Sequence, residues 1–137
     1  SKAIYSSDLA LKQGGILILV TPCPEGVSSE FPQIKDIGYR SFSDIDALVA
    51  RGEITDLTLA AHLVHVGRVI REKSTAILVS SGINHEMATR IGFEWAATPQ
   101  EALNRALDCK GKTASIAVLR NGGEIMPVLE GNHDERQ

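Results

Sequence analysis

The chain has 137 residues, a length that fits one domain built around one hydrophobic core. Its net charge is −3 and its 14 basic residues form no run, which argues against a nucleic-acid or anionic-membrane surface, since both need clustered Lys and Arg. The longest aliphatic run, residues 16–20, is far too short to cross a bilayer, and nothing resembles a signal peptide. We therefore expect a cytoplasmic protein with no nucleic-acid partner and no membrane partner.

The first elements are a helix and a buried strand. Apolar residues at helical spacing predict a helix over residues 2–12, which the pair Gly14-Gly15 ends. The run 16–20 is apolar on both faces, which is typical of a central strand in a covered, largely parallel sheet. Two prolines and a glycine in residues 21–26 then predict a rigid loop.

Helical patterns follow this loop. Residues 27–39 have an ambiguous pattern that allows a short helix over 29–34, and we expect a second helix that Ser43 caps and Gly52 ends. A longer helix is predicted over 56–73, with Asp56 as N-cap and apolar residues at helical spacing.

The second half of the chain repeats this alternation. In chain order it predicts a buried strand over 75–79, a loop of Ser80, Ser81 and Gly82, a helix capped by Asn84 and ended by Gly92, a short strand over 93–96, and a helix from the cap Thr98 to Cys109. Strand-like residues 115–119 and 125–129 around Asn121-Gly122 predict an antiparallel hairpin. The order of elements indicates an α/β fold: a single three-layer domain, with a mostly parallel sheet, helices on both faces and this hairpin at the edge.

Ligand sites in such sheets gather beyond the carboxyl ends of the strands. Those ends carry a first loop with Thr21, Cys23, Glu25 and Gly26, and a second loop with Ser80 and Ser81. Small polar side chains and free backbone N–H groups could bind an anion or a partner there. Alternatively, the loops are tight turns that need Gly and Pro, and we favour this simpler interpretation from the residues alone.

Histidines and cysteines give no complete catalytic set. His62 and His65 are three residues apart on one predicted helix, but no third ligand accompanies them, so we predict packed or surface histidines and no metal site. Cys23 follows a strand, where a nucleophile could be presented, but the sequence shows no base beside it. We predict a structural thiol.

Residues 12–26, which read KQGGILILVTPCPEG, resemble a segment in the C-terminal half of the nickel-dependent lactate racemases and their uncharacterised relatives. Residues 56–63, 76–80 and 98–103 continue the resemblance in matching order, so it covers nearly the whole chain. It implies that residues 1–130 are the C-terminal α/β domain of a larger two-domain protein, followed by a polar tail over 131–137.

The resemblance also implies a function and a partner. In this family a nickel pincer nucleotide takes hydride from a 2-hydroxy acid and returns it to either face, in a cleft between two domains. The catalytic histidines and the cofactor-anchoring lysine belong to the N-terminal domain, so this chain should be inactive alone and bind no cofactor by itself. Lys2 resembles the lysine of a Gln-x-x-Lys pair that the C-terminal domain contributes to catalysis.

One departure concerns the substrate. Lactate racemases carry a tryptophan near the position of Thr58, where this chain has Asp56, Leu57 and Thr58. A smaller and more polar cleft wall indicates a larger or more polar 2-hydroxy acid, or a sugar acid, in place of lactate. Two alternatives stay open: a non-enzymatic module that binds a small ligand or a protein through its strand-end loops, and a hydrolase that uses Cys23.

Overall fold

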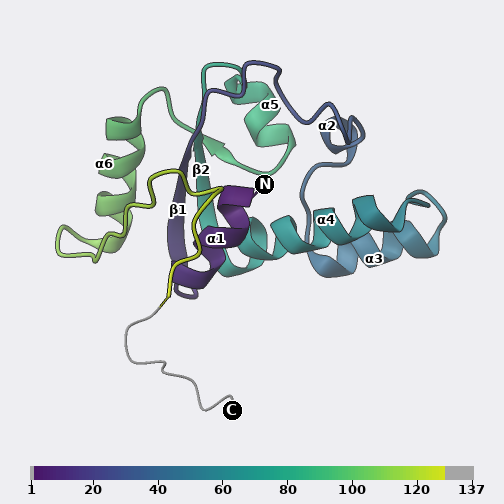
Figure 1. Cartoon of the computed structure of the whole chain (residues 1–137), viewed down its shortest axis with the longest axis horizontal. Coiled ribbons are helices and arrows are strands. Elements are labelled where there is room, and N and C mark those ends of the chain that lie inside the picture. Colours follow the sequence, from purple (N-terminus) through teal and green to yellow (C-terminus); the bar gives the residue numbers. More distant parts are fainter. Residues whose placement is uncertain (1, 129–137) are drawn as a thin grey trace, which may run out of the picture.

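The computed structural model describes residues 2–128 (Figure 1). Ser1 and the predicted polar tail 131–137 lie outside these residues. Three strands, β1 (Gly15–Val20), β2 (Ser74–Val79) and β3 (Glu94–Trp95), form one parallel sheet in the order β1-β2-β3. The helices are α1 (Lys2–Ala10), α2 (Ile34–Ile37), α3 (Phe42–Ala50), α4 (Leu57–Gly67), the π-helical continuation η1 (Arg68–Lys73), α5 (His85–Arg90) and α6 (Pro99–Lys110).

Helices cover both faces of the sheet, which confirms the predicted three layers. Alternate residues of a strand point to opposite faces. Leu17 of β1 and Leu78 of β2 therefore join the large apolar cluster under α1, α4, η1 and α5, whereas Ile77 of β2 joins a smaller cluster with Ala102 of α6. Figure 1 shows α6 on the opposite side of β1 and β2 from α1.

Most predicted helix starts are confirmed at the level of their caps. Asp56 accepts the backbone N–H groups of Thr58 and Leu59, and Thr98 accepts that of Glu101. Asn84 caps α5 in the same way, through Met87 N–H. Each cap satisfies donors that a helix leaves without intrahelical partners.

Two predicted boundaries were wrong. Ser41, not Ser43, caps α3 and accepts the N–H of Asp44, so that helix begins two residues early. The short helix predicted over 29–34 instead begins at residue 34. The prediction failed there because the side chain of Ser28 accepts the N–H of Phe31, which stabilises a turn ahead of the helix.

The predicted antiparallel hairpin is also wrong, because residues 115–119 and 125–128 form no strand. The turn itself exists: Asn121 has φ +53° and its carbonyl accepts the N–H of Glu124. The flanking residues have no apolar layer to pack against, and a two-stranded hairpin without one is marginal. This segment instead passes beside the start of α1, where a Cβ at Gly122 would contact Ala3 at 3.4 Å.

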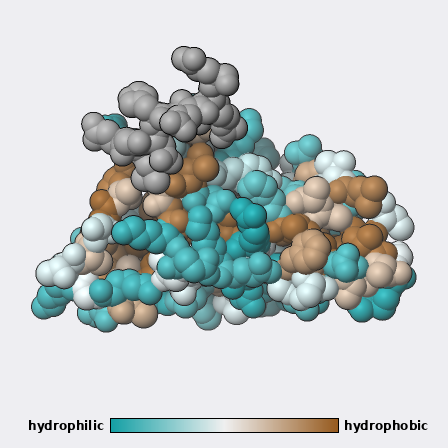
Figure 2. All heavy atoms as spheres, turned by 90° about the horizontal axis from the view of Figure 1, so that it is seen from below, coloured by the Kyte–Doolittle hydropathy of each residue, from teal (hydrophilic) through white to brown (hydrophobic). Residues whose placement is uncertain are grey.

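Several large apolar side chains stay exposed among the described residues. One group lies in the C-terminal segment, where Val118 and Met126 are 81% and 73% exposed, and Phe42 and Leu57 are exposed at the starts of α3 and α4. Figure 2 shows apolar surface beside the grey residues and again on the side that α3 and α4 occupy. No helix among the described residues is long and apolar enough to span a membrane.

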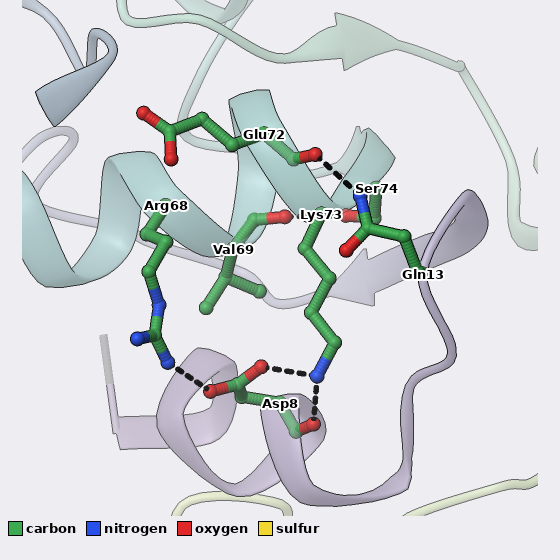
Figure 3. A network of polar contacts seen from close by, with 7 residues as sticks. All are labelled: Asp8, Gln13, Arg68, Val69, Glu72, Lys73 and Ser74. Atoms are coloured by element: carbon green, nitrogen blue, oxygen red, sulfur yellow. Dashed lines mark hydrogen bonds and ion pairs between the residues drawn. The ribbon is translucent and has the colours of Figure 1, made fainter.

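A network of ion pairs connects α1 to η1 (Figure 3). Lys73 Nζ donates to a carboxylate oxygen and to the carbonyl oxygen of Asp8, both at 2.6 Å, and Arg68 donates to the other carboxylate oxygen at 3.2 Å. Partial burial would raise the pKa of Asp8, but the hydrogen bonds and charges of Lys73 and Arg68 outweigh it and lower that pKa. The ionised carboxylate therefore stabilises the fold.

We expect Asp8→Asn to lower the free energy of unfolding by about 1–3 kcal/mol at pH 7, because it removes charge-assisted bonds. A carboxyl with a lowered pKa contributes stability above its usual value of 3.8, and that contribution disappears as the pH falls further. Denaturant titrations should therefore show that the difference in free energy of unfolding between the wild-type protein and Asp8→Asn disappears below about pH 4. Glu53→Gln is the control, because its pair with Arg51 is exposed and should matter little. An undiminished gap at low pH would contradict this assignment.

Gly67 lets α4 pass close to the backbone of Arg40, since a Cβ at Gly67 would lie 2.1 Å from that carbonyl oxygen. Alanine normally stabilises a helix relative to glycine. Here we expect Gly67→Ala to destabilise the protein by about 1–3 kcal/mol through overpacking. The control is Gly52→Ala, because a Cβ at Gly52 would meet no atom within 4 Å, although the residue has φ +73°. We expect this control to lower the free energy of unfolding by only about 1 kcal/mol, measured by thermal or denaturant unfolding. A stabilised Gly67→Ala protein would be the opposite of this prediction.

Candidate functional site

The two predicted strand-end loops lie together at the carboxyl edge of the sheet. The carbonyl oxygen of Pro22 accepts the N–H of Gly82 at 2.9 Å and the hydroxyls of Ser80 and Ser81 at 3.1 and 3.3 Å. A Cβ at Gly82 would lie 1.8 Å from the carbonyl oxygen of Cys23, so only glycine fits this approach. The register of β1 and β2 thus brings both loops into direct contact.

A cavity of about 370 Å³ opens beside these loops. Its walls are mainly aliphatic and aromatic: Ile4, Leu19, Val27, Phe31, Ile83 and Phe93 contribute to them. Thr21, Cys23, Gly26, Ser28, Glu30, Tyr39 and His62 supply the polar part of the lining. An apolar cavity with a few convergent polar groups is the usual form of a small-ligand site.

His62 of α4 is the centre of the polar part of the cavity. Its Nδ1 lies 2.8 Å from the hydroxyl of Tyr5, and its Nε2 lies 3.2 Å from the hydroxyl of Tyr39. The ring of Phe31 stacks on the imidazole, with centroids 5.6 Å apart. α1, the loop after α2 and the middle of α4 therefore converge on one imidazole.

Burial favours the uncharged form of each of these three groups. It lowers the pKa of His62, a shift that the charge of His65 reinforces and that of Glu30 opposes. Burial also raises the pKa of Tyr39 far above its ordinary value, and it raises the pKa of Tyr5. A neutral imidazole between two neutral phenols can donate and accept one hydrogen bond each.

The structure brings only some of the predicted site residues to the cavity. Thr21, Cys23 and Gly26 line it, while Glu25 is exposed and does not. The hydroxyls of Ser80 and Ser81 both donate to the carbonyl oxygen of Pro22, and these hydrogen bonds hold the two loops together.

The predicted site residues on the helices do not line the cavity. The carboxylate of Asp56 is occupied as the N-cap of α4. Exposed Thr58 lies one turn before His62 on the same face of that helix. Exposed Lys2 lies three residues before Tyr5, so these two side chains are neighbours on α1. Neither Lys2 nor Thr58 lines the cavity.

The sequence interpretation missed Tyr5, Tyr39 and Phe31 and assigned His62 no role. The scarcity of aromatic residues, which make up only 4% of the chain, was the one available sequence signal. In the structure, both tyrosines of the chain bond to the same histidine. That convergence joins residues 5, 39 and 62, which no local spacing relates. It became visible only in three dimensions.

Cys23 has no base among the described residues. Its Sγ lies 3.6 Å from the hydroxyl of Thr21, and both nitrogens of His62 are occupied by tyrosines. Its φ of +41° is a strained value for a non-glycine residue, which the contact with Gly82 maintains. The arrangement supports the predicted structural role of the thiol better than a hydrolase.

No group of three or more His, Cys, Asp or Glu side chains within residues 2–128 could hold a metal ion. The described residues therefore offer no ligand set for nickel. A second cavity, of about 340 Å³, lies behind Tyr39 between α2 and α5, and exposed surface charges such as Arg40, Arg71 and Asp36 line it.

Comparison with known proteins agrees with this fold. The family described as the lactate racemase C-terminal domain matches residues 1–126. The chain is similar in structure to the lactate racemase apoprotein from Thermoanaerobacterium thermosaccharolyticum, with a TM-score of 0.60 and 19% sequence identity. That match covers 81% of this chain but 27% of the other, so this chain spans about a quarter of that relative. None of the curated proteins matches the chain.

The partly buried position of His62 predicts a pH dependence of stability. Because its folded-state pKa is below the usual 6.5, the unfolded chain takes up a proton that the folded chain resists. Stability is therefore fully present above pH 6.5 and falls as the pH drops below it. His62→Gln should remove this slope in denaturation experiments from pH 7.5 down to about pH 5. The control His85→Gln, at an exposed histidine, should keep it; an unchanged slope in His62→Gln would refute this role of burial.

Proposed function

This chain belongs to the lactate racemase C-terminal domain family, and on that basis we propose that it is the C-terminal domain of a 2-hydroxy acid racemase or epimerase. The proposal is carried by a family match that extends over residues 1–126, almost the whole chain. Because the chain spans 27% of its structural relative, the remaining parts of an active site would come from another domain of the same protein.

In this proposal the chain forms one wall of an interdomain cleft and is inactive alone. The cavity, the Tyr5–His62–Tyr39 cluster and Lys2 at the start of α1 would face that cleft. The exposed apolar residues of the C-terminal segment and of α3 and α4 favour a partner surface, because such patches commonly mark interfaces. The N-terminal domain of the same protein is the partner we propose.

A nickel pincer nucleotide would supply hydride transfer in the complete enzyme. Residues 2–128 hold no group of three or more possible metal ligands, and we propose that the N-terminal domain anchors the cofactor. What this chain would supply is charge and shape. The ammonium of Lys2 would stabilise the substrate carboxylate or a developing alkoxide, and Thr21, Cys23 and Gly26 would shape the cavity.

We also propose a cytoplasmic location, in line with the acidic composition and the two unpaired cysteines, Cys23 and Cys109. The alternative is a non-enzymatic α/β module that binds a small ligand through the same cavity. Reading the coding sequence upstream of Ser1 separates the two: a long preceding region with clustered histidines supports the enzyme, and a nearby start codon supports the module.

The decisive test uses the two-domain protein loaded with cofactor and a chiral assay of 2-hydroxy acids. We expect racemisation or epimerisation of at least one of them, and none from the isolated chain. Lys2→Ala should lower kcat/KM about 10²–10³-fold, as removal of one transition-state donor does. Lys110→Ala, at the exposed end of α6, should leave it unchanged. Full activity in Lys2→Ala would remove Lys2 from the site, and turnover by the isolated chain would overturn the proposal.

A further inference from the structure

The cavity is large and apolar for a site that accepts a small hydroxy acid. Its volume of about 370 Å³ corresponds to roughly ten water molecules, far more than the methyl group of lactate would fill. Leu19, Val27, Ile83 and Phe93 are among its walls, and none of the lysines and arginines within residues 2–128 lines it. Among the same residues, Glu30 is the one acidic side chain in the lining. An apolar chain would therefore gain by burial there more than a carboxylate would.

The direction of the hydrogen bonds of His62 depends on which ring nitrogen carries the proton. A neutral imidazole carries one N–H and one bare nitrogen, and both face phenols here. In the Nε2–H tautomer, Tyr5 O–H donates to Nδ1 at 2.8 Å and Nε2–H donates to the oxygen of Tyr39 at 3.2 Å. In the Nδ1–H tautomer both hydrogen bonds run the opposite way.

The Nε2–H tautomer leaves the hydrogen of the Tyr39 hydroxyl without a partner. Tyr39 then accepts from His62, so its own O–H is available, and no other hydrogen bond of that hydroxyl is present within residues 2–128. Tyr39 is partly buried and lines the cavity beside His62. A hydroxyl in such a place needs an acceptor, because an unpaired buried donor is unfavourable.

We propose that His62 carries its proton on Nε2, that the cavity receives the side chain of the substrate, and that Tyr39 O–H donates a hydrogen bond to a carbonyl or hydroxyl oxygen on that side chain. This inference rests on the proposed function and names its substrate class: a 2-hydroxy acid with an apolar side chain longer than methyl that carries one acceptor oxygen. The substrate carboxylate stays at the mouth, on the side of Lys2. His62 and Tyr5 are positioning residues that fix the direction of the Tyr39 hydroxyl.

The same walls disfavour the sugar acid that the small residues near Thr58 indicated. A sugar acid would place several hydroxyls against side chains such as Leu19, Ile83 and Phe93, which offer no hydrogen-bond partner. The polar part of the lining, which includes Tyr39 and His62, is smaller than the apolar part and favours a side chain with few polar groups.

The first test needs no ligand. NMR of this chain labelled with ¹⁵N-histidine reports which nitrogen of His62 carries the proton. At pH 8 we expect the neutral Nε2–H form, with the Nδ1 resonance shifting in Tyr5→Phe because its donor is lost. The Nδ1–H form would overturn the proposal, because Tyr39 would then donate to His62 and have no free hydrogen.

The second test compares two acids that differ by one oxygen, 2-hydroxyhexanoate and 2-hydroxy-5-oxohexanoate. Calorimetry with the two-domain protein should show about tenfold tighter binding of the keto acid, the size expected for one neutral hydrogen bond. Tyr39→Phe should reduce that preference to less than about twofold and leave the affinity for 2-hydroxyhexanoate nearly unchanged. Absence of the preference, its survival in Tyr39→Phe, or tighter binding of gluconate would each overturn the proposal.

Tyr5→Phe provides a second variant in case Tyr39→Phe does not fold. It keeps the Tyr39 hydroxyl but frees its direction, so we expect a partial loss of the keto preference; full retention would remove Tyr5 and His62 as positioning residues. The outcomes also separate this inference from the proposed function. Protein that binds the keto acid through Tyr39 but racemises no 2-hydroxy acid would refute the function alone, and a racemase without the preference would refute the inference alone.

Discussion

The parallel pairing of β1 with β2 is the constraint on which the site depends. It aligns Val20 with Val79, so both strands end at the same level and both following loops leave from the same edge. Two loops this close must share backbone contacts, and the carbonyl of Pro22 accepts three donors from the second loop. Because Gly82 has no side chain, the loops close on each other and one side of the cavity becomes a fixed wall.

The other side of the cavity depends on how α1 is held. Ile4 lines the cavity and Tyr5 reaches His62, but α1 contributes only one fully buried residue, so apolar packing alone fixes it weakly. The carboxylate of Asp8 supplies the missing constraint at the other end of the helix, where Lys73 and Arg68 of η1 bind it. A charge network outside the cavity thereby helps to position the phenol of Tyr5 on His62, and a change at Asp8 would reach the cluster through α1.

Local chemistry made much of the fold predictable, and the site much less so. Aliphatic runs at 16–20 and 75–79 specify buried parallel strands, and Asp56, Asn84 and Thr98 mark helix starts, because each signal lies within a few residues of what it determines. The hairpin around Asn121 failed for the complementary reason: its turn is local, but its strands need an apolar layer that the sheet does not offer. The Tyr5–His62–Tyr39 cluster joins three elements, so no window of sequence contains it.

In the proposed function the chain would separate two kinds of recognition in space. Lys2 is exposed at the start of α1, while within residues 2–128 no lysine or arginine and one acidic side chain line the cavity. A ligand with a carboxylate at one end and an apolar body at the other matches this gradient, because each end gains where the other would lose. The hydroxyl of Tyr39 then adds a directional requirement inside an otherwise non-directional cavity. Removing a hydrogen-bond partner from a buried donor costs more than adding a methylene gains, so this single group would govern selectivity more strongly than the size of the cavity does.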